Sequence, residues 1–126
     1  MFKMAVPVLH VRSSVAAERF YCHGLGFGVE FRYRPNESEH DPCYLGVVRD
    51  GVVLHLSTFP GDGVPGSAVY VFVDDVDRLH AEFISKGVPI DTPPVDQTWG
   101  MREMFVRDPD GNRVQFGQVR PRTSAG

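Results

Sequence analysis

Hydrophobic and polar positions follow the same plan twice along the chain. Residues 8–27 (VLHVRSSVAAERFYCHGLGF) and residues 69–88 (VYVFVDDVDRLHAEFISKGV) each place an alternating stretch before a polar cap, a helical hydrophobic pattern and a glycine. Alternation is typical of a β-strand with two unlike faces, and the longer spacing is typical of an amphipathic helix. Aligning the copies places Leu9 on Val71, so the core-facing positions coincide. The sequence therefore predicts a duplicated strand–helix unit.

The ends of the two helices are predicted from their flanking residues. A short polar side chain can cap the first turn, and a glycine can take the left-handed conformation that ends a helix. These signals are Ser13 or Ser14 and Gly24 for a first helix that runs to about His23, and Asp74 or Asp75 and Gly87 for the second.

Strand-like segments follow each predicted helix. Residues 27–34 form one, and residues 44–59 have the pattern of a hairpin that turns at Asp50-Gly51. In the second half, residues 103–118 have the same form around the turn at residues 108–111. The predicted fold class is therefore α+β, with two paired βαβββ modules forming a curved mixed sheet, helices outside and a concave inner face. The expected divisions of this single domain (1–126) are a first module (5–59), a linker (60–67), a second module (68–118) and a flexible tail (119–126).

Composition narrows the class of protein without changing the fold. A chain of 126 residues with 42% hydrophobic and 23% charged residues fits one globular domain. A net charge of −3 lacks the positive charge that is typical of nucleic-acid-binding proteins. No apolar run is long enough for a signal peptide or a membrane span. Cys22 and Cys43 favour free thiols in a reducing cytoplasm, although a bridge between them stays open. We therefore expect a cytoplasmic protein that binds neither nucleic acid nor membranes.

Short motifs add a resemblance to a known family. GLGF (24–27) follows the first predicted helix, and DPDGN (108–112) precedes the last strand. With the duplicated unit, these motifs make residues 5–118 similar to the vicinal oxygen chelate superfamily, which includes glyoxalase I, extradiol dioxygenases, fosfomycin-resistance enzymes and bleomycin-resistance proteins. The segments that resemble the bleomycin-resistance branch more specifically are AVPVL (5–9), GVVRDGVVL (46–54) and WGMREMFVRDPDGN (99–112).

The resemblance also implies an assembly. In the bleomycin-resistance branch, a proline in the first strand accompanies exchange of the N-terminal strand between two subunits, and Pro7 matches that proline. Members of the branch are dimers that hold drug in clefts between the subunits. The resemblance therefore implies a homodimer with a swapped first strand.

Metal chemistry is disfavoured by the same resemblance. Metal-using members of the superfamily draw ligands, typically His, Glu or Gln, from four positions on the concave face. By pattern these positions fall on Val6, His55, Ala68 and Gln115. Two aliphatic side chains cannot bind a metal, and one imidazole with one amide is a poor divalent site. We expect no metal and no cofactor. The alternative is a displaced site at His10, His55 and Gln115, with or without Glu103.

Aromatic residues stand on the expected inner face instead. By the resemblance, the positions that match the lining of the drug cleft are Trp99, Tyr44, Tyr70, Phe72 and Phe31. A planar ligand gains about 0.5–1.5 kcal/mol per stacked pair beyond burial, and aromatic faces attract cations. A place in the core is the alternative for Phe72 and Phe31.

Polar residues complete the predicted site. Glu30 and Glu103 are expected to supply counter-charge, although a salt bridge between neighbouring Arg102 and Glu103 is an alternative for the latter. The expected polar wall consists of His55, His10 and Gln115.

These residues predict a non-catalytic function. We expect the protein to bind and sequester a planar or cationic small molecule, with bleomycin-like antibiotics as the case that the resemblance implies. The main alternative is a metal-dependent lyase or dioxygenase that uses the displaced site. A sensor or accessory domain that acts through a partner protein is a third possibility.

Overall fold

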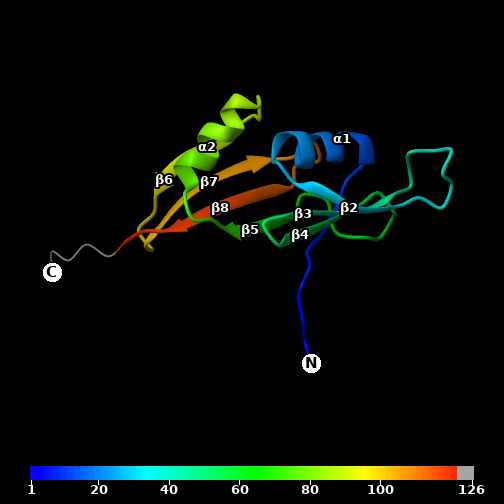
Figure 1. Ribbon diagram of the computed structural model, residues 1–126, viewed down its shortest axis with the longest axis horizontal. Helices are drawn as coiled ribbons and strands as arrows, with labels where there is room; N and C mark the ends of the chain where they lie inside the picture. The colour runs from blue at the N-terminus through cyan, green and yellow to red at the C-terminus, as the bar shows by residue number, and fades with distance from the viewer. Residues whose placement is uncertain (122–126) are drawn as a thin grey trace.

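Two four-stranded sheets, one from each half of the chain, form the structure, a computed structural model that describes residues 1–121 (Figure 1). The first has the order β1-β4-β3-β2 and contains β1 (Val8–His10), β2 (Gly28–Tyr33), β3 (Tyr44–Arg49) and β4 (Val52–Ser57). The second has the order β5-β8-β7-β6 and contains β5 (Ala68–Phe72), β6 (Thr92–Asp96), β7 (Met101–Arg107) and β8 (Arg113–Val119). In both sheets the first strand runs parallel to the last, and the other neighbours are antiparallel. This repetition confirms the two predicted βαβββ modules.

The helices begin where the sequence predicts, but the first one ends differently. Ser13 caps α1 (Ser14–Glu18), and its side chain accepts a hydrogen bond from the Ala16 amide at 3.1 Å. The helix continues as a π-helical turn, η1 (Arg19–Gly24), and the left-handed glycine is Gly26 with φ 80°, not Gly24. The wider π turn displaces the stop by two positions, which a pattern of hydrophobic spacing does not reveal.

The second helix, α2 (Val76–Ser85), agrees with its predicted signals. Asp75 is the cap, and its carboxylate accepts a hydrogen bond from the Arg78 amide at 3.0 Å. Gly87 follows the helix with φ 73°. Both helices lie on one side of the two sheets, and the N-terminal segment projects on the other side (Figure 1).

The hydrophobic core lies between the sheets and these helices. Alternate strand residues face the helices and are buried, together with helix residues such as Tyr21 and Phe83. In the first sheet the buried strand residues include Leu9, Leu45, Val47, Leu54 and Leu56. In the second sheet they include Val71, Met104, Val106, Val114 and Phe116. The opposite strand residues therefore form a second face on each sheet, away from the helices.

One strand, β6, has no clear signal in the sequence. It contains two prolines, Pro93 and Pro94, and its pairing with β7 is irregular between Thr92 and Val95. It lies at the edge of the second sheet, where a missing backbone donor does not interrupt a central ladder. Its place is decided by the edge of the sheet and not by its own propensity.

The DPDGN turn attaches the second module to the first. Tyr21 Oη donates to Asp108 Oδ2 at 2.8 Å, and Asn112 Nδ2 donates to the carbonyl oxygen of His10 at 2.9 Å. Burial, together with the charge of Asp108, raises the pKa of Tyr21 well above its usual value. At the other end of the boundary, Arg49 of β3 forms a two-pronged ion pair with Glu82 of α2. Side-chain contacts at two places thus hold the modules together.

Three further expectations concern the cysteines, the tail and membranes. Both cysteines are free, and burial raises the pKa of the Cys22 thiol to about 11, so this thiol stays protonated at neutral pH. The predicted tail (119–126) lies, from residue 122 on, outside the described residues, and β8 extends to Val119. No helix within residues 1–121 is long and apolar enough to cross a membrane.

Candidate functional site

The sheet surfaces that point away from the helices, here called the open faces, gather most of the predicted site residues. Strand register brings Phe31, Gly46 and His55 side by side in the first sheet. In the second sheet, Tyr70 is aligned with Gln115, and Gln115 with Phe105. Each open face therefore presents one aromatic cluster, and the two clusters belong to different modules.

The second-sheet cluster, Tyr70, Trp99, Glu103 and Gln115, is arranged around one carboxylate. Tyr70 Oη donates to Glu103 Oε2 at 2.6 Å, and Trp99 Nε1 donates to the same oxygen at 3.3 Å. Gln115 Nε2 donates to Glu103 Oε1 at 3.0 Å. Three neutral donors from three separate segments thus converge on Glu103, which is only 4% exposed.

The charge of Glu103 has no cationic partner among residues 1–121. The predicted alternative of an Arg102–Glu103 salt bridge is wrong, because adjacent strand residues point to opposite faces. Arg102 instead binds Asp77 of α2 at 3.0 Å and Asp96 of β6 at 3.1 Å. Burial, with the hydrogen bond to Glu103 and its charge, raises the pKa of Tyr70 to about 12, so the hydroxyl remains a donor at neutral pH. The cluster is therefore an anionic centre beneath aromatic rings.

Several of these rings are open to solvent. Trp99 is 65% exposed, Phe72 is 70% exposed and Tyr70 is 39% exposed. The Tyr70 and Phe72 ring centroids lie 5.0 Å apart. The alternative that Phe72 and Phe31 belong to the core is wrong, since both lie on the open faces and Phe31 is 39% exposed. Free aromatic surface of this size is typical of a binding site.

The first-sheet cluster, Phe31, Tyr44 and His55, is built differently. The Phe31 and Tyr44 rings lie parallel with centroids 6.1 Å apart, and His55 meets Phe31 edge-on at 5.4 Å. Tyr44 Oη lies 2.9 Å from His55 Nδ1, within hydrogen-bonding distance. The rings of this cluster thus pack mainly against one another, and the cluster contains no carboxylate.

A glycine lies under one ring of each cluster. A Cβ added to Gly46 of β3 would collide with the Phe31 ring, and one added to Gly117 of β8 would collide with Tyr70. Each ring therefore covers a neighbouring strand at a distance that only glycine allows. Neither glycine was predicted from the sequence, although strand parity places both on the open faces.

Two predicted site residues stay outside the clusters. His10 lies on the open face of the first sheet, and its Nδ1 donates to the carbonyl oxygen of Asp62 at 3.0 Å. Glu30 lies at the irregular part of β2 and is exposed, and its side chain makes no hydrogen bond or ion pair with any other residue in 1–121. Neither residue contacts the second-sheet cluster.

Two aromatic residues that the sequence analysis did not single out also lie near the clusters. Phe105 follows Glu103 by two positions on the open face of β7, and the guanidinium of Arg113 lies 5.1 Å from its ring centre. Tyr33 extends the first face and stacks on Phe59 with centroids 6.2 Å apart. The alternation of β2 and β7 was the signal that could have identified them.

Comparison with known proteins places this geometry in a family. Residues 1–122 match the family described as glyoxalase superfamily protein. The chain belongs to the glyoxalase/bleomycin resistance/dioxygenase superfamily. The predicted resemblance is thereby confirmed, and so is the predicted fold. No curated protein matches the chain.

Solved structures of this superfamily include antibiotic-binding proteins. A bleomycin-binding protein from bleomycin-producing Streptomyces verticillus, complexed with copper(II)-bleomycin, is 29% identical, with 97% of this chain and 98% of that chain covered and a TM-score of 0.71. TnmS3, an antibiotic binding protein from Streptomyces sp. CB03234, is 26% identical, with 94% and 98% covered and a TM-score of 0.70. A second bleomycin-binding protein, complexed with bleomycin, shares the fold at 23% identity, with 94% and 100% covered and a TM-score of 0.74.

The superfamily's metal-ligand positions can now be located in this member. Val6 precedes β1, Ala68 begins β5, His55 lies in β4 and Gln115 in β8. His55 faces Tyr44 and Gln115 binds Glu103, so both donors already have protein partners. Within residues 1–121, no three His, Cys, Asp or Glu side chains gather as a metal cage. The displaced alternative would draw on His10 and His55 from one sheet and on Gln115 from the other.

Proposed function

We propose that this superfamily member binds and sequesters a planar, cationic small molecule on its aromatic open faces, and that bleomycin-like antibiotics are the class to test first. The observation that supports this most strongly is the second-sheet cluster. Its exposed indole and phenol rings are hydrogen-bonded to a buried carboxylate that has no cationic partner within residues 1–121. Such a centre can attract a cationic ligand to the ring faces while the carboxylate itself stays dry.

The ring faces supply the affinity for a flat ligand. Trp99 and Phe72 expose large areas that a heteroaromatic ring system would cover. Each stacked pair adds about 0.5–1.5 kcal/mol beyond burial. Because Trp99 and Tyr70 are fixed through Glu103, little rotamer freedom remains to be lost when a ligand binds.

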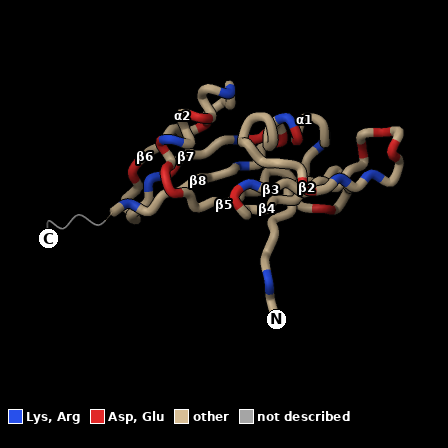
Figure 2. The backbone as a smooth tube through the Cα atoms, in the orientation of Figure 1, with Lys and Arg blue, Asp and Glu red and all other residues tan. Residues whose placement is uncertain are grey.

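A homodimer is part of this proposal. The open faces and the N-terminal segment both leave apolar side chains in solvent, among them Phe2, Met4 and Phe72. Figure 2 shows the segment leaving the body of the molecule with a single charged residue, Lys3. Pairing of this segment with a second subunit would cover it, and would let a first-sheet cluster of one subunit face a second-sheet cluster of the other. Light scattering of the full chain and of a chain lacking residues 1–5 tests this, and a monomeric full chain would contradict it.

The binding proposal is tested by titrating chelator-treated protein with metal-free and with copper(II)-loaded bleomycin. Trp99 is the sole tryptophan, so its fluorescence reports the second-sheet cluster alone. We expect saturable quenching at about one drug per subunit, with the recovered drug chemically unchanged by mass spectrometry. Calorimetry with Trp99→Ala and with the matched surface variant Ile84→Ala, on the exposed side of α2, should show weaker binding in the first only.

Three results would overturn the proposal. If neither form of the drug binds, bleomycin-like ligands are excluded. If the drug is altered during incubation, and metal analysis of protein purified without chelator finds a bound divalent ion, the protein is an enzyme. Binding that survives in Trp99→Ala but not in Ile84→Ala would place the site elsewhere.

A further inference from the structure

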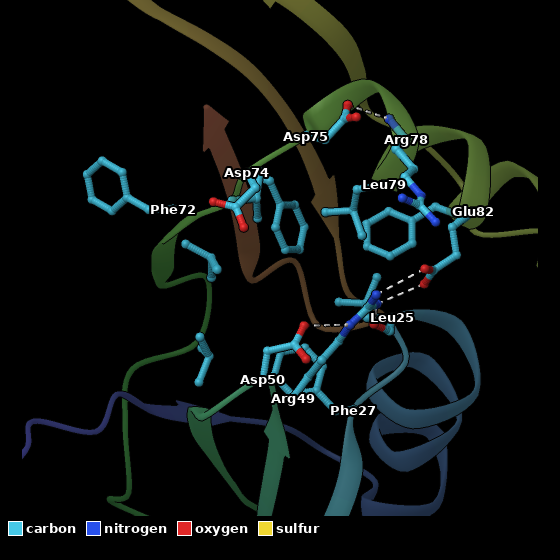
Figure 3. A pocket seen from close by; sticks show the side chains of 15 residues that line it. Leu25, Phe27, Arg49, Asp50, Phe72, Asp74, Asp75, Arg78, Leu79 and Glu82 are labelled. Atoms are coloured by element: carbon cyan, nitrogen blue, oxygen red, sulfur yellow. Dashed lines mark hydrogen bonds and ion pairs between the residues drawn. The ribbon is translucent and has the colours of Figure 1, made fainter. Parts of the chain in front are cut away.

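A separate cavity lies on the helix side of the boundary between the modules. It has a volume of about 560 Å³, within the range of roughly 300–1,000 Å³ that small-molecule pockets occupy. Leu25, Phe27 and Val52 line it from the first module, and Val71, Leu79 and Phe83 line it from the second. We call it the seam pocket (Figure 3).

The seam pocket is distinct from the aromatic open faces. A smaller groove on the opposite side of the boundary is lined by Met4, Pro7 and Tyr70, and it shares Val52 and Val71 with the seam pocket. These two valines therefore separate the two sides of the boundary. Phe72, whose ring belongs with Tyr70, is turned away from the other lining side chains in Figure 3.

The floor of the pocket is apolar and rigid. Phe27, Val71, Phe83 and Phe116 are buried and belong to the hydrophobic core. The Phe83 and Phe116 rings pack edge to face with centroids 5.4 Å apart. A hydrophobic ring seated here would contact side chains that are already ordered, which limits the entropy lost on binding.

The rim is charged, and most of its free charge is negative. Arg49 is committed to Glu82 by two hydrogen bonds of 2.8 and 3.0 Å, and it also donates to the Leu25 carbonyl oxygen. The Asp50 side chain is 90% exposed and lies 3.8 Å from Arg49 Nε, a weak contact. Asp74 makes no hydrogen bond or ion pair with residues 1–121, and neither does the Arg78 guanidinium. Asp75, also in the lining, caps α2 by accepting from the Arg78 amide. The rim thus holds two loosely held carboxylates, one capping carboxylate and one free guanidinium.

We propose that the seam pocket is a second small-molecule site, which binds an amphipathic amine: an apolar ring system that bears one protonated amino group. The ring occupies the floor formed by Phe27, Leu79 and Phe116. The ammonium group lies at the rim near Asp50 and Asp74. Arg78 would favour an anionic ligand instead, so the sign of the ligand's charge is the decisive variable.

Nuclear magnetic resonance on the full chain tests this, with naphthylmethylamine as the probe and naphthoate as its anionic match. We expect the amine to shift amide resonances around Asp50–Val52 and Val71–Leu79 and to bind more tightly than the acid. Asp74→Asn should lower the affinity for the amine roughly two- to fivefold, and the double variant with Asp50→Asn should lower it roughly tenfold. Glu37→Gln, an exposed carboxylate in the distant loop after β2, is the matched control and should change nothing.

Three outcomes would overturn the inference. Equal or tighter binding of naphthoate would show that charge selection is not made by the two aspartates. Shifts confined to Tyr70, Trp99 and Glu103 would place the amine on the open face. Absence of any shift up to the solubility limit of the amine would show that the seam pocket is not a site. None of these results depends on whether bleomycin binds to the open faces.

Discussion

The two sheets have one topology and two different open faces. In the first, Phe31, Tyr44 and His55 stack on one another and share a single polar contact. In the second, Tyr70 and Trp99 are tied to a buried carboxylate, and their ring faces remain free. Duplication of a fold therefore does not duplicate its chemistry, because the function depends on open-face side chains that the core does not constrain.

The open faces of the two sheets would therefore contribute differently to ligand binding. The second sheet offers charge together with free aromatic surface, and the first offers mainly a hydrophobic wall. Four changes in the two clusters test this distinction.

Removal of the central carboxylate should have the largest effect. Glu103→Ala leaves three donors without their acceptor and removes the negative charge. We expect affinity for cationic bleomycin to fall by about 10- to 100-fold, and the free energy of unfolding to fall by about 1–3 kcal/mol. Calorimetry and urea denaturation measure the two quantities. His55→Ala in the first sheet is the matched variant, and an equal loss of affinity there would erase the proposed asymmetry.

Removal of the exposed indole should affect binding without affecting stability. Trp99 is mostly in solvent and contributes one long hydrogen bond of 3.3 Å. The affinity of Trp99→Ala for the drug should be about tenfold lower, because stacking and burial are lost. Its midpoint of urea denaturation should stay within error of that of the unchanged protein. Phe31→Ala in the first sheet should have a smaller effect on affinity. A larger effect from Phe31→Ala would mean that the first face dominates binding.

The two glycines under the rings allow a paired test of packing. Gly117→Ala and Gly46→Ala should each displace the ring above them, Tyr70 and Phe31 respectively. Overpacking of this kind costs about 1–3 kcal/mol, which thermal denaturation can measure. Only Gly117→Ala should also quench or shift Trp99 fluorescence, since Tyr70 and Trp99 share Glu103. An unchanged Trp99 spectrum would indicate that the two side chains are not coupled.

The smallest effect concerns pH. The pKa of Tyr70 is raised from 10.0 to about 12, so the protonated hydroxyl is favoured in the folded chain. The stabilisation that results is complete below pH 10 and is lost as pH rises toward 12. Glu103→Gln should lower this pKa while leaving Tyr44 unaffected, which site-resolved tyrosine titration can follow. An unchanged pKa of Tyr70 in Glu103→Gln would show that the Glu103 carboxylate does not raise this pKa.

The fold was more predictable than the site. Repeated core positions, the Ser13 and Asp75 caps, and the Asp50-Gly51 turn follow local rules, and the structure agrees with them. The π turn of η1 and the proline-containing strand β6 follow no such rule. Both depend on contacts with the rest of the module.

Within the site, both Tyr70 and Glu103 were predicted as candidates, but the sequence pattern did not reveal their hydrogen bond. Nor did it separate Glu30, which stands alone in solvent, from Glu103, which accepts three hydrogen bonds. Both are glutamates on strands, and sequence treats them alike. The difference arises because Tyr70 of β5 and Gln115 of β8 lie on other strands, which only the folded sheet brings to Glu103.

The duplicated modules and their core faces were predictable from the sequence, because hydrophobic period and turn chemistry act over a few residues. The aromatic candidates came from the resemblance to the family. The carboxylate at the centre of a cluster, the rings that remain free and the position of the seam pocket were not predictable in this way. Those features depend on the pairing of strands and the docking of modules, in which residues far apart along the chain become neighbours.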